Sequence, residues 1–153
     1  MNQPTQRIIT LDGPAGVGKT TMAKRVAGAL GLAYLDTGAM FRATALHLGE
    51  GAWELSEAVL GERLDTLGFS LQGTGAETRL LLNDTVIGQE IRTEEVGMWA
   101  SNIGAIPIVR AFQKKAQRAI GEAFSLTAEG RDMGTVVFPW AAPKFFLDAS
   151  PEA

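Results

Sequence analysis

From residue 13 the chain reads Gly13-Pro14-Ala15-Gly16-Val17-Gly18-Lys19-Thr20, which matches the phosphate-binding pattern G-x-x-x-x-G-K-S/T at every fixed position. Its glycines let the backbone wrap so closely that successive N–H groups can point at phosphate oxygens. The Lys19 ammonium adds a mobile positive charge for the same oxygens, and the Thr20 hydroxyl can ligate Mg²⁺. We therefore expect residues 13–20, together with Thr21, to bind the phosphates of a nucleoside triphosphate, with Thr20 at the metal.

The residues on either side of this loop favour a phosphate site over a chance glycine-rich turn. The run before it, residues 7–12, is short, apolar and β-branched, as is typical of a buried parallel strand. A strand, a glycine-rich loop and a helix start in this order form an anion site, because the positive end of the helix dipole faces the phosphate. Gly31 is a typical C-terminal cap for that helix. Its apolar face is expected at Ala23, Val26, Ala27 and Leu30.

The composition of the chain excludes several classes of function. Its 153 residues are enough for one domain with a sizeable core. The 14 basic and 17 acidic residues give a net charge of −3, which argues against a nucleic-acid polymer or an anionic membrane as the main partner. Without cysteine the chain has neither a disulfide framework nor a thiolate metal site. The polar N-terminus lacks a signal-peptide pattern and the apolar runs are too short to span a bilayer, so we expect a cytoplasmic protein. Nothing in the sequence points to an obligate protein partner.

Hydrophobic patterns along the rest of the chain predict alternating strands and helices. We expect strands at 32–35, 126–129 and 144–148, and helices at about 39–48, at about 57–67 after an N-cap at Ser56, from Thr93 and from Pro107. The apolar stripe of the last helix is expected at Val109, Phe112, Ala116 and Ala119. In between, three short antiparallel strands are expected at 69–72, 78–82 and 85–87, with Asn83-Asp84 as a two-residue turn. This order predicts an α/β fold of the P-loop NTPase type, with a parallel sheet flanked by helices and a small inserted antiparallel β-hairpin region.

The end of the sequence carries a separate signal. Residues 150–152, Ser-Pro-Glu, combine an N-cap candidate, a proline at the first helical position and an acidic residue in the first turn. These preferences predict the start of a helix, but the sequence ends at Ala153, before that helix could continue. We therefore expect a chain truncated at its C-terminus, the alternative being a frayed tail.

The phosphate-binding loop alone does not say which reaction the protein performs. A switch GTPase is disfavoured, because the string at residues 65–68, Asp-Thr-Leu-Gly, falls at the end of a predicted helix and no N-K-x-D string is present. Three arginines, Arg42, Arg110 and Arg131, lie on separate segments, and the carboxyl ends of parallel strands converge on one crevice. There the arginines could clamp a second phosphate opposite the triphosphate, although each taken alone is also compatible with a solvated surface arginine.

Five stretches together are similar to a known family, and they stand at residues 9–19 (ITLDGPAGVGK), 35–42 (LDTGAMFR), 89–96 (QEIRTEEV), 107–110 (PIVR) and 129–139 (EGRDMGTVVFP). With them the chain resembles the bacterial cytidylate kinases, which are nucleoside monophosphate kinases, over nearly its whole length. The strings at 35–42 and 130–138 are specific to that family, whereas the phosphate-binding loop is not.

The resemblance implies transfer of a phosphoryl group from ATP, with Mg²⁺, to CMP or dCMP. It also implies a P-loop core at 1–36 and 125–153, a nucleoside-monophosphate-binding region at 37–124 that carries the hairpin insertion at about 68–92, and a mobile lid. The lid and the C-terminal helices of the family are absent from this sequence, together with arginines of a kind that contributes about 10³–10⁵-fold in rate. We therefore expect this chain to bind nucleotide weakly and to turn over little or not at all.

The resemblance also assigns roles to phosphate-contacting residues by position. Lys19, Arg131 and Asp132 form the implied catalytic group. Arg42 and Arg131 are implied to hold the phosphate of the monophosphate, where they offset repulsion between two anions that must approach closely. Asp36 is a candidate to orient a metal-bound water.

The implied contacts to the rest of the monophosphate come from other segments. Ser101 and Arg110 are implied to bind the cytosine edge, with Asp132 in the same pocket, and Thr37 to contact the nucleotide. Phe41 stands where the family often has tyrosine, so the ring is kept and one hydroxyl is lost. Two alternatives remain: another small-molecule kinase, such as an adenylate or shikimate kinase, and a nucleotide-binding module without catalysis.

Overall fold

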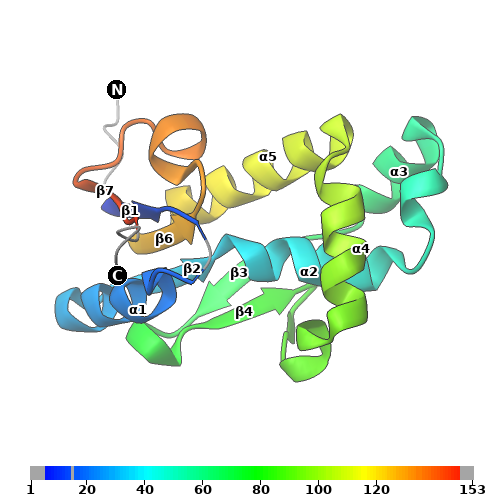
Figure 1. Cartoon of the computed structure of the whole chain (residues 1–153). Coiled ribbons are helices and arrows are strands. Elements are labelled where there is room, and N and C mark those ends of the chain that lie inside the picture. Colours follow the sequence, from blue (N-terminus) through cyan, green and yellow to red (C-terminus); the bar gives the residue numbers. More distant parts are fainter. Residues whose placement is uncertain (1–5, 15, 149–153) are drawn as a thin grey trace.

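The computed structural model describes residues 6–14 and 16–148, and its centre is a four-stranded parallel sheet (Figure 1). The strands are β1 (Ile8–Asp12), β2 (Ala33–Asp36), β6 (Leu126–Gly130) and β7 (Lys144–Phe146), in the spatial order β2-β6-β1-β7. In the register of the sheet Ile8 of β1 lies opposite Leu126 of β6 and Thr10 lies opposite Lys144 of β7. Every residue of β1 is buried, which explains its mostly apolar sequence.

Helices cover both faces of this sheet, which confirms the predicted α/β fold. On one face α1 (Lys19–Leu30) shares a buried cluster with β1, formed by Ala23, Ala27, Ile9 and Leu11. On the other face α5 (Pro107–Ala123) places Ile120 in a cluster with Ile8. Successive residues of β1 therefore serve opposite layers, as the alternation of side chains along a strand requires.

Three further helices pack together beyond the end of the sheet, around a second core (Figure 1). They are α2 (Thr37–Leu48), α3 (Glu57–Leu64) and α4 (Glu94–Gly104), and each begins with a side-chain cap, supplied by Asp36, Ser56 and Thr93. The N-cap predicted at Ser56 is thus confirmed. Short helical turns connect the elements at η1 (Ala52–Glu54), η2 (Gly75–Glu77), η3 (Gln89–Arg92) and the π-turn η4 (Met133–Val137).

The predicted antiparallel region forms a separate three-stranded sheet. Its strands are β3 (Phe69–Gln72), β4 (Arg79–Leu82) and β5 (Thr85–Val86), in that spatial order. Asn83 and Asp84 connect β4 to β5 with φ values of 50° and 66°. Positive φ at both central residues is typical of the tight hairpin turns that favour asparagine and aspartate. The two-residue turn predicted from the sequence is therefore confirmed.

Details of three helices differ from the prediction. Leu30 of α1 is 47% exposed, because Ala23 and Ala27 make the contact with the sheet and Leu30 points away from it. Ala119 of α5 is also exposed, and α3 ends at Leu64, earlier than expected. The buried face of α5 instead carries two polar residues, since it is formed by Val109, Gln113, Gln117 and Ile120. Polar residues on a buried face break the apolar pattern on which the prediction relied.

The contact between α5 and the sheet can be tested at a glycine. Replacing Gly121 with alanine should destabilise the protein by about 1–3 kcal/mol, because the new Cβ would lie 2.5 Å from Cε1 of the buried Phe138 ring. The matched variant Gly28→Ala, inside α1, adds a Cβ that meets no described atom within 4 Å. It should stabilise the protein by about 0.5–1 kcal/mol. Thermal unfolding measures both effects, and a Gly121→Ala protein as stable as wild type would contradict the close packing of α5.

Two predictions fall on residues outside the described ranges, namely the helix start at 150–152 and Ala15 of the phosphate-binding loop. Within residues 6–14 and 16–148, no helix has both the length and the apolar character needed to cross a membrane. The division of the chain into a core at 1–36 and 125–153 and a second region at 37–124 stays a prediction.

Candidate functional site

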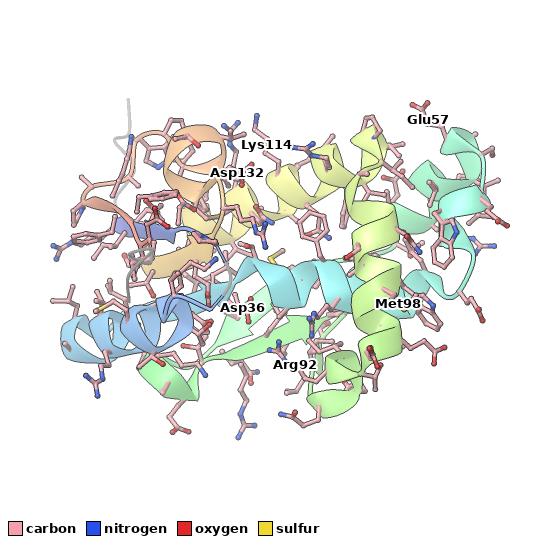
Figure 2. The ribbon with its side chains drawn as sticks, in the orientation of Figure 1. Asp36, Glu57, Arg92, Met98, Lys114 and Asp132 are labelled. Atoms are coloured by element: carbon pink, nitrogen blue, oxygen red, sulfur yellow. The ribbon has the colours of Figure 1, made fainter. Side chains whose placement is uncertain are left out.

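A cleft of about 740 Å³ opens at the carboxyl ends of β2 and β6. Parallel sheets commonly form ligand sites at this edge. The walls of the cleft come from the loop before α1, the first turns of α2, the middle of α5 and the segment that follows β6. Figure 2 shows Lys114 and Asp132 above the start of α2, and Asp36 and Arg92 below it. The fold therefore brings segments from distant parts of the sequence to one place.

The loop before α1 has a backbone that demands glycine. Gly13 has a φ of 145°, and a Cβ at this position would collide with the carbonyl oxygen of Leu147. Gly16 and Gly18 have φ values of 82° and 85°, in the left-handed region that other residues rarely adopt. Gly18 is also the N-cap of α1. The first N–H groups of α1 have no partner within the helix and can bind an anion at this point.

Lys19 holds its positive charge in the cleft without an acidic partner among residues 6–14 and 16–148. Its Nζ donates hydrogen bonds to the carbonyl oxygens of Gly13 at 2.5 Å and Gly130 at 3.1 Å. The ion pair between Arg92 and Asp36 does not involve Lys19. Because carbonyl oxygens carry no net charge, the ammonium is oriented but not neutralised, and it remains available to an anion in the cleft.

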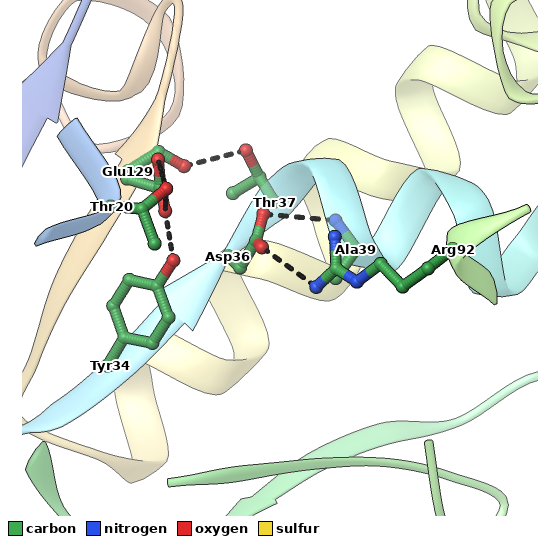
Figure 3. A network of polar contacts seen from close by, with 7 residues as sticks. All are labelled: Thr20, Tyr34, Asp36, Thr37, Ala39, Arg92 and Glu129. Carbon is green, nitrogen blue, oxygen red and sulfur yellow. Dashed lines mark hydrogen bonds and ion pairs between the residues drawn. The ribbon is translucent and has the colours of Figure 1, made fainter. Parts of the chain in front are cut away.

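A buried carboxylate at the end of β6 forms the centre of a polar network (Figure 3). Glu129 is only 6% exposed and accepts hydrogen bonds from the Thr20 hydroxyl at 2.8 and 3.0 Å. It also accepts a hydrogen bond from the Tyr34 hydroxyl. Sequence reasoning did not select Glu129 as a site residue. The sequence signal that could have identified it is its place as an acidic residue at the end of a predicted buried strand, directly before Gly130.

The environment of Tyr34 predicts an unusual titration. Burial raises the pKa of Tyr34, and the negative charges of Asp36 and Glu129 raise it further. The folded protein therefore keeps a neutral phenol at pH values where the unfolded chain, with its usual pKa of about 10, ionises. Because the folded pKa is the higher one, this stabilising contribution is complete below pH about 10 and is lost as the pH rises above that value.

Tyr34 is the only tyrosine of the chain, so its titration can be followed without ambiguity. We expect no phenolate absorbance in the folded protein near pH 10, and a single step near this pH in urea. At higher pH, phenolate absorbance and loss of circular dichroism should appear together. The Tyr34→Phe variant provides the spectral baseline. A phenolate step near pH 10 in protein that is still folded would contradict the buried Tyr34–Glu129 contact.

The polar side chains at the junction of β2 and α2, Asp36 and Thr37, form hydrogen bonds and an ion pair with other residues of the chain. The Asp36 carboxylate accepts a hydrogen bond from the Ala39 N–H at 3.1 Å and forms an ion pair with Arg92 at 3.4 Å (Figure 3). Asp36 therefore caps α2 and links it to η3, and its expected role in orienting a metal-bound water stays a prediction. The buried Thr37 hydroxyl donates to the Glu129 carbonyl at 2.8 Å, which leaves its lone pairs for a ligand.

The three arginines singled out in the sequence all line this cleft. Arg42 comes from α2, Arg110 from α5 and Arg131 from the segment after β6. No hydrogen bond or ion pair is recorded for any of them with the described residues. Six cationic side chains and three carboxylates line the cleft, although the chain as a whole carries a net charge of −3. The cleft is thus the part of the molecule suited to a multiply charged anion.

The remaining expected site residues divide into two groups. Within the described chain the lining includes Phe41 and Asp132, together with Gly16, Gly18, Lys19, Thr20, Thr21 and Thr37. Gly13, Pro14 and Val17 belong to the loop but do not line the cleft, and Ser101 is exposed on α4, also outside the lining. The structure therefore brings Lys19, Thr20, Arg42 and Arg131 to one cleft, whereas their phosphate contacts and a base contact by Ser101 stay predictions.

Comparison with known proteins gives consistent matches along the chain. A family model described as cytidylate kinase matches residues 9–153. A cytidylate kinase of Maridesulfovibrio salexigens is 63% identical over 148 residues, which are 97% of this chain and 66% of that protein. One from Nitratidesulfovibrio vulgaris is 59% identical over 146 residues, or 95% of this chain and 63% of that protein. One from Oleidesulfovibrio alaskensis is 56% identical over 145 residues, or 95% of this chain and 66% of that protein. The chain thus spans slightly less than two thirds of the length of these relatives.

Proposed function

This chain belongs to the cytidylate kinase family, and we propose that it serves the transfer of the γ-phosphoryl group of ATP to CMP or dCMP, giving CDP or dCDP. The observation that carries the proposal is the convergence of Arg42, Arg110 and Arg131, unpaired with any described acid, on the cleft beside Lys19. Two phosphate-bearing molecules can approach closely only if cations offset their repulsion. The names of the relatives supply the cytosine base, which the geometry alone does not specify.

The donor side of the proposed site is the loop at 13–20 with Thr21. Lys19 and the first N–H groups of α1 would bind the phosphates of ATP. The Thr20 hydroxyl suits Mg²⁺, because its single hydrogen points to Glu129 and its lone pairs are therefore free to face the cleft. When bound there, Mg²⁺ would neutralise charge on the donor phosphates. Glu129 would in this way orient the proposed metal ligand.

The acceptor side is formed by residues on α2, α5 and the segment after β6. Arg42 and Arg131 would hold the phosphate of CMP, and Thr37 would contact the same nucleotide. Arg110 and Asp132 would bind the base, with the Phe41 ring as an apolar surface. The support for these roles is the common position of all five residues in the cleft lining. The role proposed for Ser101 rests on the family resemblance alone.

The proposed chemistry needs no general base. The attacking atom is a phosphate oxygen of CMP that is already anionic at neutral pH, so no proton has to be removed before attack. The residues of the cleft therefore contribute by aligning donor and acceptor and by stabilising the charge that spreads over the transferred group. This agrees with a cleft rich in unpaired cations, in which the carboxylates of Glu129 and Asp36 are occupied in hydrogen bonds. We also propose a cytoplasmic location, where such nucleotides are made and used.

A coupled assay of ADP release tests the proposal directly. ATP with Mg²⁺ is offered together with CMP, dCMP, UMP, AMP or shikimate, both to this chain and to the complete reading frame that contains it. Preference for CMP and dCMP supports the proposal, and activity of the complete frame alone would assign part of catalysis to residues outside this sequence. Turnover of AMP or shikimate instead would identify another kinase. Nucleotide binding without any turnover by either protein would indicate a non-catalytic module.

A further inference from the structure

The carboxylate of Asp12 joins the end of β1 to the segment that carries Arg131 and Asp132. Its Oδ1 accepts a hydrogen bond from the Met133 N–H, and its Oδ2 accepts one from the Gly134 N–H, both at 2.8 Å. Asp12 is 6% exposed, and among the described residues it takes part in no ion pair. A buried carboxylate is costly unless its oxygens are satisfied, so these two backbone donors are essential partners for it.

The same segment lies close to the sheet and to the phosphate-binding loop. A Cβ on Gly134 would lie 2.7 Å from the Thr10 Oγ1, so the backbone here approaches β1 more closely than a larger residue allows. The carbonyl oxygen of Gly130 accepts a hydrogen bond from the Lys19 Nζ at 3.1 Å. Residues 130–134 are therefore tied at one end to the loop lysine and at the other end to Asp12.

We propose that Asp12 is a positioning residue of the acceptor site: by fixing Met133 and Gly134 it holds Arg131 and Asp132 in place beside the phosphate-binding loop. The inference rests on the proposed phosphoryl transfer and adds to it a residue that itself touches neither substrate. Hydrogen bonds to an ionised carboxylate are about twice as strong as neutral ones, and both oxygens of Asp12 take part. A misplacement of about 1 Å can cost about a hundredfold in rate, so a firm anchor at this point matters for catalysis.

The variant Asp12→Asn tests the proposal with little change in shape. A carboxamide has one acceptor oxygen and one donor NH₂ group, so one of the two backbone N–H groups loses its acceptor and meets a donor. In the protein of the complete reading frame, we expect kcat/KM for CMP to fall about tenfold to a hundredfold, while KM for ATP stays close to the wild-type value. Binding of CMP, measured by calorimetry, should weaken in parallel.

Thr10→Val is the matched control on the same strand. Thr10 is two residues before Asp12, so it points to the same side of β1, and it is fully buried with an Oγ1 that has no hydrogen-bond partner among the described residues. Valine keeps the shape and removes this unsatisfied hydroxyl, so kinetic constants should stay unchanged and stability should stay equal or rise. An equal loss of CMP turnover in both variants would mean that packing, and not the Asp12 carboxylate, is responsible, which would overturn the proposal.

Amide hydrogen exchange of the wild-type protein provides a second test that needs no variant. The N–H groups of Met133 and Gly134 should exchange as slowly as the paired amides of β6, and rapid exchange would overturn the proposal even if Asp12→Asn failed to fold. The kinetic outcomes also distinguish a failure of the proposed phosphoryl transfer from a failure of the positioning role of Asp12. If the wild-type protein of the complete reading frame phosphorylates no monophosphate, the proposed function is refuted. Normal wild-type turnover with unchanged constants in Asp12→Asn refutes only the positioning role.

Discussion

Replacing Lys19 with methionine in the protein of the complete reading frame is expected to lower kcat for the proposed phosphoryl transfer by about a hundredfold or more, with the fold retained. The Nζ of Lys19 donates to two neutral carbonyl oxygens, of Gly13 and Gly130, so its charge is free to stabilise the phosphate oxygens of the donor. Methionine keeps a long apolar side chain and removes the charge and the donors. Steady-state kinetics with CMP as acceptor measure the effect, and circular dichroism verifies the fold.

Lys24→Met is the control for this experiment. Lys24 lies one turn further along α1, above the Tyr34 ring at 5.6 Å from its centroid, and it does not line the main cleft. Its loss should leave kcat close to the wild-type value, because the charge that matters is the one beside the phosphate-binding loop. A Lys19→Met protein with more than about a tenth of wild-type kcat would contradict the proposed role of Lys19.

The phosphate-binding loop and its flanking elements could be predicted because their signals are local. Glycines at positions 13, 16 and 18 do adopt backbone conformations that favour glycine, and β1 and α1 lie directly before and after them. The meeting of Arg42, Arg110 and Arg131 could also be predicted, but by a topological rule. Parallel strands end at one edge of a sheet, so segments that follow them converge whatever their distance in sequence.

The network around Glu129 could not be derived in the same way. Its partners Thr20 and Tyr34 lie 109 and 95 residues away, and no periodicity or motif relates these three positions. The hydrogen bonds of Asp12 could not be predicted either, because its partners are backbone N–H groups about 120 residues further along the chain. Such contacts depend on which strands become neighbours, and this is decided by the packing of the whole sheet.

The two glutamines of α5 show why a hydrophobic pattern can mislead at a site. Gln113 and Gln117 are 1% and 2% exposed, yet both line the cleft. The Gln113 Nε2 donates to the Thr44 hydroxyl at 2.7 Å, so a specific partner compensates part of the cost of burial, whereas the Gln113 Oε1 has no partner among the described residues. Polar residues therefore occupy buried positions where α5 passes the cleft. A prediction that follows apolar residues alone misses these positions and places exposed Ala119 on the buried face.

In the protein of the complete reading frame, Arg131→Met should reduce kcat/KM for CMP by about a thousandfold or more, with KM for ATP nearly unchanged. The guanidinium lines the cleft without an acidic partner among the described residues, so its full charge is available to the acceptor phosphate and to the charge that develops on the transferred group. Its backbone is held between the Lys19 contact at Gly130 and the Asp12 contacts at Met133 and Gly134, so little reorganisation is needed when substrate binds.

Two further variants test whether the effect of Arg131→Met comes from losing the guanidinium group at this position. Arg131→Lys keeps a point charge but loses the planar pair of donors, so its activity should fall between those of wild type and Arg131→Met. Arg25→Met removes an exposed arginine on α1 that lies outside the cleft lining, and it should leave all constants unchanged. If Arg131→Met kept kcat/KM for CMP within about tenfold of wild type, the anion would be held by Arg42 and Arg110 without it. The convergence of three arginines would then no longer explain how the acceptor phosphate is brought to the donor.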